Sequence, residues 1–231
     1  MTRFFVTPEE MAMKPPCLTG DNAAHARVLR LKPGEQVLLC DGQGQECLCQ
    51  VENLTPEGLA LAVLERRESC AEARVRVSVY MAFPKGDKLE HVIQKATELG
   101  AYEIVAFPSA RCISRPDVKS LQKKLERWQK IAASAAEQSG RGRIPQVLVL
   151  GSYREALERA AQADSGFLFY ENEQATTLQM AMTGFAGTTL SLLTGPEGGL
   201  EASEVEQAQK AGLQVCTLGK RILRCETAPL C

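Results

Sequence analysis

The sequence predicts an α/β protein in which a small β-rich domain, residues 1–72, is followed by a larger α/β domain, residues 73–231. Up to residue 72, short apolar runs are separated by turn signals, and only one short stretch has a helical period. From residue 73 onward, strand-like runs alternate with segments of helical periodicity. This alternation is typical of a mostly parallel sheet, which binds ligands at the carboxyl ends of its strands.

The first domain is predicted to contain three strands that form a small barrel or sandwich. Asp41 and Gly42 give a hairpin-type turn signal between the first two strands, and a short helical period covers Ala23–Leu31. Cys47 and Cys49 lie two positions apart in the second strand and therefore share a face, where they are expected to be small core residues and not metal ligands. The strands are expected at Val37–Cys40, Glu46–Val51 and Leu59–Leu64.

The second domain is predicted to contain six strands and at least two amphipathic helices. Apolar residues repeat at helical spacing over Leu89–Leu99, and Gly100 supplies a stop signal. A second stripe over Leu121–Ala135 includes Trp128, which is therefore expected in the core and not as a platform for base stacking. The strands are expected at Val75–Ala82, Ile104–Phe107, Val147–Leu150, Phe167–Tyr170, Thr189–Leu193 and Val215–Leu218.

The distribution of charge is more informative than the net charge of −1. Between residues 111 and 145, nine basic residues stand against three acidic ones, and the acidic residues that balance them lie later in the chain. Such an excess fits a surface that contacts phosphate groups, and it fits a solvated amphipathic helix equally well. The basic residues are Arg111, Arg115, Lys119, Lys123, Lys124, Arg127, Lys130, Arg141 and Arg143.

The cysteines and the N-terminus indicate a cytosolic protein with reduced thiols. The nine cysteines are scattered without a C-x-x-C pair, and the N-terminal residues include acids and prolines where a signal peptide has an apolar run. No stretch approaches the ~18–20 apolar residues of a membrane span. Because His25 and His91 are the only histidines, no metal site is expected.

A glycine-rich segment, LLTGPEGGL at residues 192–200, follows the fifth predicted strand of the second domain. Gly195, Gly198 and Gly199 allow the backbone to approach a ligand closely and to adopt positive φ angles. The segment is not a phosphate-binding P-loop, since no Gly-Lys-Ser/Thr follows it. Taken alone, it predicts either a ligand-binding loop or a structural turn.

A second polar segment, LGKRILRCETAPL at residues 218–230, follows the last predicted strand. It brings Arg221, Arg224 and Glu226 together behind Gly219. Thr227 can cap a helix, and Arg224 can pair with Glu226, so each residue also has a structural explanation. The combination of this segment with the glycine-rich one favours a binding site at the ends of the late strands.

These two segments resemble the late motifs of the SPOUT methyltransferases, and most closely those of the 16S ribosomal RNA uridine N3-methyltransferase family. The resemblance extends over nearly the whole chain. The blocks that carry it are HARVLRLKPGEQVLLCDG (residues 25–42), KGDKLEHVIQKATELG (85–100), RC (111–112), KKLERWQKIAASAAEQSGRGRIPQV (123–147), GPEGG (195–199) and LGKRILRCETA (218–228).

The resemblance implies a fold and a cofactor. Residues 1–72 resemble a PUA-like β-barrel domain that binds RNA, and residues 73–231 a SPOUT methyltransferase domain with a C-terminal trefoil knot around S-adenosylmethionine. It also implies a homodimer with the knot at its interface, and a substrate in 16S ribosomal RNA, in the assembled small subunit. The implied cofactor-binding residues are Gly195, Gly198, Gly199, Leu218, Gly219, Leu223, Arg224, Thr227 and Ala228.

Three positions depart from the family pattern. Lys220 stands where the family often has proline, so this loop is expected to be less rigid. Glu201 replaces a small helix-capping residue, which is expected to weaken that cap. Cys231 stands where the family begins a last helix that packs against the knot.

The implied chemistry needs help with a proton, because N3 of neutral uridine carries one. Arg224 is the candidate for stabilising negative charge on the uracil oxygens, and Glu226 or Glu197 for removing or orienting the proton. Either glutamate can instead be a backbone cap. Glu137, Gln138 and Arg141 are expected in the same cleft.

RNA is expected to contact both domains. The candidates for phosphate contacts are His25, Arg27 and Arg30 in the first domain and Arg141 and Arg143 in the second. Two other functions remain open: a knotted enzyme that methylates a ribose 2′-oxygen of transfer or ribosomal RNA, and a non-catalytic RNA-binding protein of ribosome assembly. The position of the methyl group distinguishes the first, and binding of S-adenosylmethionine the second.

Overall fold

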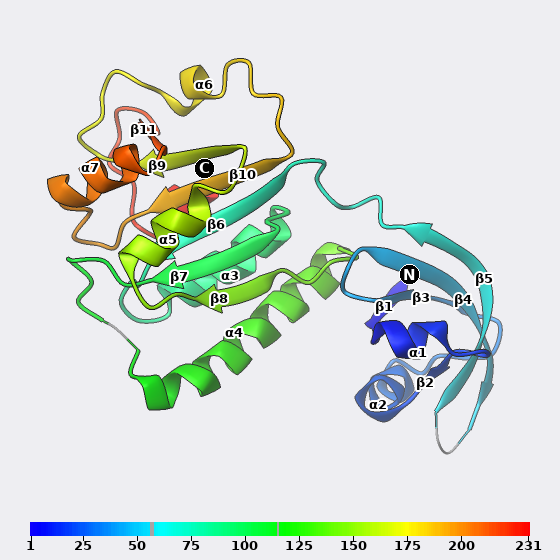
Figure 1. The fold of residues 1–231 in the computed structure, drawn as a ribbon. Helices are drawn as coiled ribbons and strands as arrows, with labels where there is room; N and C mark the ends of the chain where they lie inside the picture. The colour runs from blue at the N-terminus through cyan, green and yellow to red at the C-terminus, as the bar shows by residue number, and fades with distance from the viewer. Residues whose placement is uncertain (56–57, 115) are drawn as a thin grey trace. The chain divides into compact units, whose positions relative to one another are not determined.

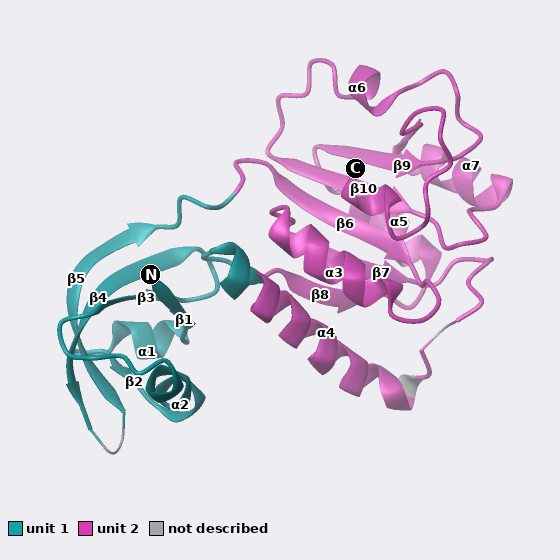
Figure 2. Ribbon diagram, turned by 180° about the vertical axis from the view of Figure 1, so that it is seen from behind, with its two compact units in different colours: residues 1–72, 136–144 teal, residues 73–135, 145–231 magenta. Residues whose placement is uncertain are grey.

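The computed structural model describes residues 1–55, 58–114 and 116–231, and contacts within the chain divide it into two units (Figure 2). The first unit consists of Met1–Glu72 together with Ala136–Ile144. The second consists of Ala73–Ala135 and Pro145–Cys231. The chain therefore leaves the second unit at the end of its longest helix and returns to it nine residues later, an excursion that the sequence did not predict.

The first unit is built on a five-stranded sheet. Its strands lie in the order β1 (Thr2–Phe5), β3 (Gln36–Cys40), β4 (Gln45–Leu54), β5 (Leu59–Glu68) and β2 (Cys17–Leu18). The predicted strands are confirmed as β3, β4 and β5, which are antiparallel neighbours. Two register shifts occur between β4 and β5, and such irregularities bend a sheet; the curvature is visible in Figure 1.

Two helices, α1 (Pro8–Ala12) and α2 (Gly20–Val28), contribute to the core of this unit together with one face of the sheet. Cys47 and Cys49 belong to this core and are fully buried, which confirms their prediction as small core residues. The sheet ends at β1 and β2, and no pairing between these two strands closes it among the described residues. Within these residues the sheet is open and curved, and its strand side chains form the core together with Met11, Ala23 and Ala26 of the helices.

Buried ion pairs hold the first unit together. The guanidinium of Arg3 contacts the carboxylate of Glu46 at 2.6 Å. The guanidinium of Arg141 donates to Glu72 at 2.7 Å, and the backbone N–H groups of Gly142 and Arg143 donate to the other oxygen of Glu72 at 3.1 Å. Glu72 therefore binds the segment Ala136–Ile144 to this unit.

The second unit contains a six-stranded sheet in which every pair of neighbours is parallel. All six predicted strands are confirmed. Their order is β11 (Gln214–Cys216), β9 (Ser165–Phe169), β10 (Thr189–Thr194), β6 (Arg76–Ala82), β7 (Glu103–Phe107) and β8 (Gln146–Val149).

Helices cover both faces of this sheet. Helices α5 (Tyr153–Ala160) and α7 (Ala202–Lys210) pack their apolar residues on one face, and α3 (Lys88–Glu98) lies on the other (Figures 1 and 2). The predicted stripe of α3 is buried from Leu89 to Ala96, but its last member, Leu99, follows the end of the helix and is 68% exposed. In α4 (Val118–Ser139), Trp128 is buried, as predicted. The remaining elements are the short helix α6 (Leu178–Ala181) and the 3-10 turn η1 (Ala228–Leu230).

Candidate functional site

A cavity of about 490 Å³ lies at the carboxyl ends of β9, β10 and β11. This is the edge at which parallel sheets bind ligands, and the volume is that of a small-molecule site. Two loops form most of its wall: residues 195–200, here called the glycine loop, and residues 217–227, here called the C-terminal loop. The remaining wall residues are Lys88, Phe169, Tyr170, Glu171, Thr194 and Ala228.

The glycine loop requires glycine for reasons of space and of backbone angle. A Cβ atom on Gly195 would lie 3.0 Å from Cγ of Leu200 and 3.2 Å from the carbonyl carbon of Gly199. Gly199 has a φ of +68°, and its N–H donates to the carbonyl of Pro196 at 2.9 Å. The loop is therefore a tight turn that presents its backbone to the cavity. Arg111 donates to the carbonyl of Gly198 at 3.1 Å and holds the turn from outside.

The C-terminal loop is shaped by Gly219 and by a backbone turn. Gly219 has a φ of +112°, with open space where a side chain would lie. The carbonyl of Arg224 accepts the N–H groups of Thr227 at 2.8 Å and Ala228 at 3.0 Å, which leads the chain into η1. Thr227 precedes this turn in a helical conformation, and its side chain makes no capping hydrogen bond; the prediction of a side-chain cap is wrong because such caps need extended backbone.

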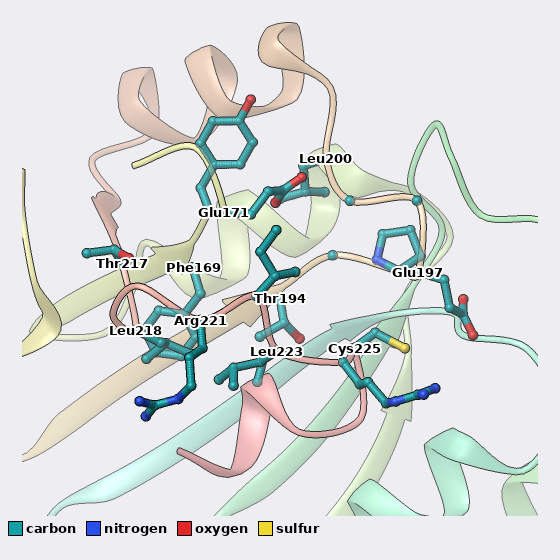
Figure 3. A pocket seen from close by; sticks show the side chains of 18 of the residues that line it. Phe169, Glu171, Thr194, Glu197, Leu200, Thr217, Leu218, Arg221, Leu223 and Cys225 are labelled. Carbon is teal, nitrogen blue, oxygen red and sulfur yellow. The ribbon is translucent and has the colours of Figure 1, made fainter. Parts of the chain in front are cut away.

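Both loops bring the expected cofactor residues to one cavity. Eight of the nine line its wall, and Thr227 is the exception. In Figure 3, Leu218 and Phe169 lie on one side of the cavity, and Cys225 and Glu197 lie on the other. The cavity thus has apolar surface suited to a flat ring at Phe169 and Leu218, where Arg221 also lies, and Glu197 on the opposite side.

The side with Glu197 is centred on Lys88, the first residue of α3. Its ammonium lies 3.0 Å from Oε1 of Glu197 and 3.2 Å from Oε2 of Glu226. Glu226 is outside the cavity wall but pairs with a residue in it. Glu226 therefore pairs with Lys88 and not with Arg224, the partner that the sequence allowed. The sequence reasoning missed Lys88, although the segment KGDKLEH had been singled out.

These contacts keep both carboxylates ionised. Burial acts to raise the pKa of Glu197, but the N–H of Lys85, its own N–H and the ammonium of Lys88 lower it below the ordinary 4.5. The pKa of Glu226 is lowered chiefly by its own N–H, with further contributions from the thiol of Cys225 and from Lys88. Hydrogen bonding to Glu197 is the main cause that raises the pKa of Lys88. Burial raises the pKa of the Cys225 thiol to about 12, so it stays protonated and donates to Glu226.

Arg224 differs from its charged neighbours. Its exposed side chain lines the cavity, and within the part of the chain that the structure describes its guanidinium has no hydrogen-bond or ion-pair partner. Five N–H donors are therefore available to a ligand. Glu171, which follows β9, also lines the cavity and was not predicted; its position after a parallel strand was the signal that could have found it.

The candidates for RNA contacts fall into two classes. His25, Arg27 and Arg30 are exposed on α2 and just after it. Arg143 is half-buried and donates to the carbonyl of Gln43. Arg141 is only 3% exposed and is paired with Glu72, so the prediction that it contacts phosphate is wrong: burial and the ion pair remove it from solvent.

The expected contribution of residues 137–141 to the cleft stays a prediction. Glu137, Gln138 and Arg141 belong to the first unit, and none of them is in the wall of the cavity. Of the basic stretch, Arg115 lies outside the described residues. Five members are exposed on α4, namely Lys119, Lys123, Lys124, Arg127 and Lys130.

Over residues 1–55, 58–114 and 116–231, no group of three or more His, Cys, Asp or Glu side chains is placed to hold a metal ion. In the same ranges, no helix combines the length and the apolar character needed to cross a membrane.

Comparisons with known proteins agree with this architecture. A family model described as an RNA methyltransferase domain matches residues 71–231, and one described as an RNA methyltransferase PUA domain matches residues 18–64. Ribosomal RNA small subunit methyltransferase E of Bacillus subtilis is 36% identical over 239 aligned positions, which cover 100% of this chain and 93% of the relative. The protein of the same name from Mycobacterium tuberculosis is 37% identical over 90% of this chain and 80% of its own length.

A solved structure is similar over the whole chain. It is ribosomal RNA small subunit methyltransferase E from Neisseria gonorrhoeae bound to S-adenosyl methionine, with a TM-score of 0.85 and 33% identity. The match covers 100% of this chain and 94% of the other.

Proposed function

The chain belongs to the family of ribosomal RNA small subunit methyltransferase E, and from this premise we propose its reaction. It transfers the methyl group of S-adenosylmethionine to N3 of a uridine in the 16S ribosomal RNA of the small ribosomal subunit. Residues 73–231 carry the cofactor site and catalysis, and residues 1–72 bind RNA. The observation that carries this proposal is the cavity formed by the glycine loop and the C-terminal loop.

The cavity fits S-adenosylmethionine in size and in chemistry. Its volume of about 490 Å³ suits a molecule with an adenine ring and two polar ends. The apolar surface of Phe169 and Leu218 suits the adenine ring, and the close backbone of Gly195 and Gly199 offers polar atoms to the ligand. We propose that Gly198, Gly219, Leu223, Arg224, Thr227 and Ala228 complete the site.

When bound, S-adenosylmethionine supplies a methyl group on a sulfonium that a nitrogen can attack in line. The main task of the chain is to hold the two reactants in that geometry, an effect worth up to ~7–11 kcal/mol in favourable systems. The second task concerns the proton on N3. Arg224 faces the cavity without a protein partner among the described residues, and we propose that it stabilises the negative charge that develops on the uracil oxygens.

Glu226 or Glu197 orients the N3 proton. Because the pKa values of both are lowered, both are carboxylates at neutral pH and can accept a hydrogen bond from N3–H. A carboxylate with a lowered pKa is a weak base. We therefore place most of the work of ionising the uracil on Arg224.

The proposal includes a trefoil knot in the second unit and a homodimer. Strand β11 lies at one edge of the sheet, yet η1, which follows it, contacts the two central strands, β6 and β10, and helix α3. A path of this kind supports a trefoil knot in which the C-terminal loop passes through the loop that precedes α7. We also propose a homodimer with this region at the interface, as the resemblance to the family implies; Ile222 in this region is 86% exposed.

The remaining proposals concern how and where the protein binds its RNA substrate. His25, Arg27 and Arg30 are exposed cations or potential cations, and we propose that they and Arg143 contact phosphate groups. An enzyme of ribosomal RNA acts where ribosomal subunits are, in the cytoplasm. The target base must leave its stack to enter the cavity.

The test is to map the methyl group. Small subunits that lack the modification are incubated with the protein and S-adenosylmethionine, and the RNA is digested and analysed by mass spectrometry. Methylation of a uracil base at N3 supports the proposal. A methyl group on ribose would establish the 2′-oxygen alternative, and binding of the RNA without any transfer would establish a non-catalytic role.

A further inference from the structure

The ammonium of Lys88 contacts both loops of the cavity at once. Glu197 belongs to the glycine loop and Glu226 to the C-terminal loop, and each has a carboxylate oxygen within 3.2 Å of the same nitrogen. The side chain of Lys88 lines the cavity and is 31% exposed. A single cation therefore joins two segments that are far apart in the sequence, at the wall of the proposed cofactor site.

The position of Lys88 is unfavourable for the helix that carries it. Lys88 is the first residue of α3, and Asp87 precedes it without a side-chain capping bond. A cation at this end of a helix is repelled by the helix dipole, which favours negative charge there. The helix alone gives no reason for a lysine at this position, whereas the two carboxylates do.

Glu197 is held by a second donor from the same segment. Its Oε1 atom accepts the backbone N–H of Lys85 at 2.9 Å and the ammonium of Lys88 at 3.0 Å. Glu226 has no equivalent backbone donor from this segment among the described residues, so its link to the rest of the cluster depends on the lysine. Removal of the ammonium would release Glu226 more completely than Glu197.

We propose that Lys88 is a positioning residue that fixes the C-terminal loop against the glycine loop and thereby shapes the cavity for the cofactor. This inference rests on the proposed function, since it assumes that the cavity binds S-adenosylmethionine. Both carboxylate oxygens lie within 3.2 Å of the same nitrogen, so without the ammonium two negative charges would remain close together with no cation between them and would repel each other. The repulsion would separate the loops and weaken cofactor binding.

The experiment measures affinity for S-adenosylmethionine by calorimetry in the full chain. Lys88→Met keeps the length of the side chain and removes its charge, and we expect affinity to fall roughly tenfold or more, within the ~5–150-fold typical of coupling between sites. Lys95→Met is the matched control, because Lys95 lies on the same helix and pairs with Glu98 away from the cavity. This control should bind as the wild type does.

A rescue separates positioning from loss of stability. Lys88→Arg retains the charge and should recover most of the affinity. Glu226→Gln in the Lys88→Met background removes the repulsion between the carboxylates, and it should bind S-adenosylmethionine more tightly than Lys88→Met alone. Thermal unfolding of each variant without cofactor reports whether the fold is intact.

The outcomes distinguish the inference from its premise. If the wild type does not bind S-adenosylmethionine, the proposed function fails. If the wild type binds and Lys88→Met binds equally well, the positioning role is wrong. If Lys88→Met loses affinity but Glu226→Gln does not restore any of it, the lysine contacts the cofactor itself and the positioning role is again overturned.

Discussion

Arg141 in the first unit and Lys88 in the second are both cations that bind carboxylates from distant segments, yet their surroundings differ. Arg141 is 3% exposed and its guanidinium, like two adjacent backbone N–H groups, is directed at one glutamate. Lys88 is 31% exposed, lines a cavity and divides its ammonium between two glutamates. The same kind of ion pair thus stabilises the fold in one unit and borders the proposed cofactor site in the other.

This difference shows which property of a charged residue indicates function. The residue type alone does not indicate function, because arginine and lysine side chains are both cations that can bind a phosphate group or pair with a carboxylate. Function is indicated instead by the exposure of the side chain and by a neighbouring cavity, and both depend on the tertiary structure. Removal of one partner lowers the free energy of unfolding more for a buried ion pair than for an exposed one.

The largest effect is expected from Arg141→Ala. It leaves Glu72 without its main partner, and loss of one partner of a buried pair costs about 3–5 kcal/mol in the free energy of unfolding. Urea denaturation measures this change, and Arg143→Ala, at the half-buried neighbour, should cost much less. Unchanged stability together with weakened RNA binding would show that Arg141 contacts RNA and that its ion pair does not stabilise the first unit.

Arg224→Ala is expected to affect the rate rather than the fold. The guanidinium has no protein partner among the described residues, so stability should change little. Loss of one electrostatic donor to a developing anion costs about 10²–10³ in rate, which single-turnover methyl transfer measures. If the variant retains the wild-type rate, Arg224 is not the stabilising group.

The dependence of this rate on pH sharpens the assignment. The rate should rise with pH as a larger fraction of uridine loses its N3 proton, and the rise should be steeper in Arg224→Ala, which lacks the stabilising cation. The pKa values of Glu197 and Glu226 are lowered from 4.5 in the folded protein, so their interactions stabilise it above pH 4.5 and are lost as pH falls through the lowered values. Neither group should produce an inflection between about pH 6 and 8; an inflection there that Glu226→Gln abolishes would show that this carboxyl group has a raised pKa in the complex.

Much of the second unit could be predicted because its signals are local. Each strand of the sheet is an apolar run, and glycines mark the loops that follow β10 and β11. Strands β1 and β2 and helix α1 were missed, since two to five residues show no period. The burial of Arg141 depends on its pairing with Glu72, which lies 69 positions earlier in the chain. The ion pairs of Lys88 depend on two loops near the end of the chain. No local pattern reports such pairings.

Gly219→Ala tests the cavity with a matched control. Gly219 and Gly212 both have positive φ angles, +112° and +95°, and both have open space where a Cβ would lie. Alanine at either position should therefore cost a similar roughly 1–3 kcal/mol of stability through backbone strain. Only Gly219 lines the cavity, so only Gly219→Ala should also weaken the binding of S-adenosylmethionine. Equal affinities in the two variants would place the cofactor elsewhere.

The smallest effect is expected from substitution of the exposed cations of the first unit. Arg27→Ala and Arg30→Ala should leave stability nearly unchanged, since both side chains are exposed. Each removes one phosphate contact, so the slope of log affinity for RNA against log salt should become shallower by roughly 0.7–0.9 per variant. Arg154→Ala is the control: Arg154 is an exposed cation of α5 that pairs with Glu158, outside the proposed RNA surface, and the slope should not change. If all three variants alter the slope alike, binding reflects general charge, and exposure alone does not identify an RNA contact; if only the first two do, α2 is part of the RNA-binding surface.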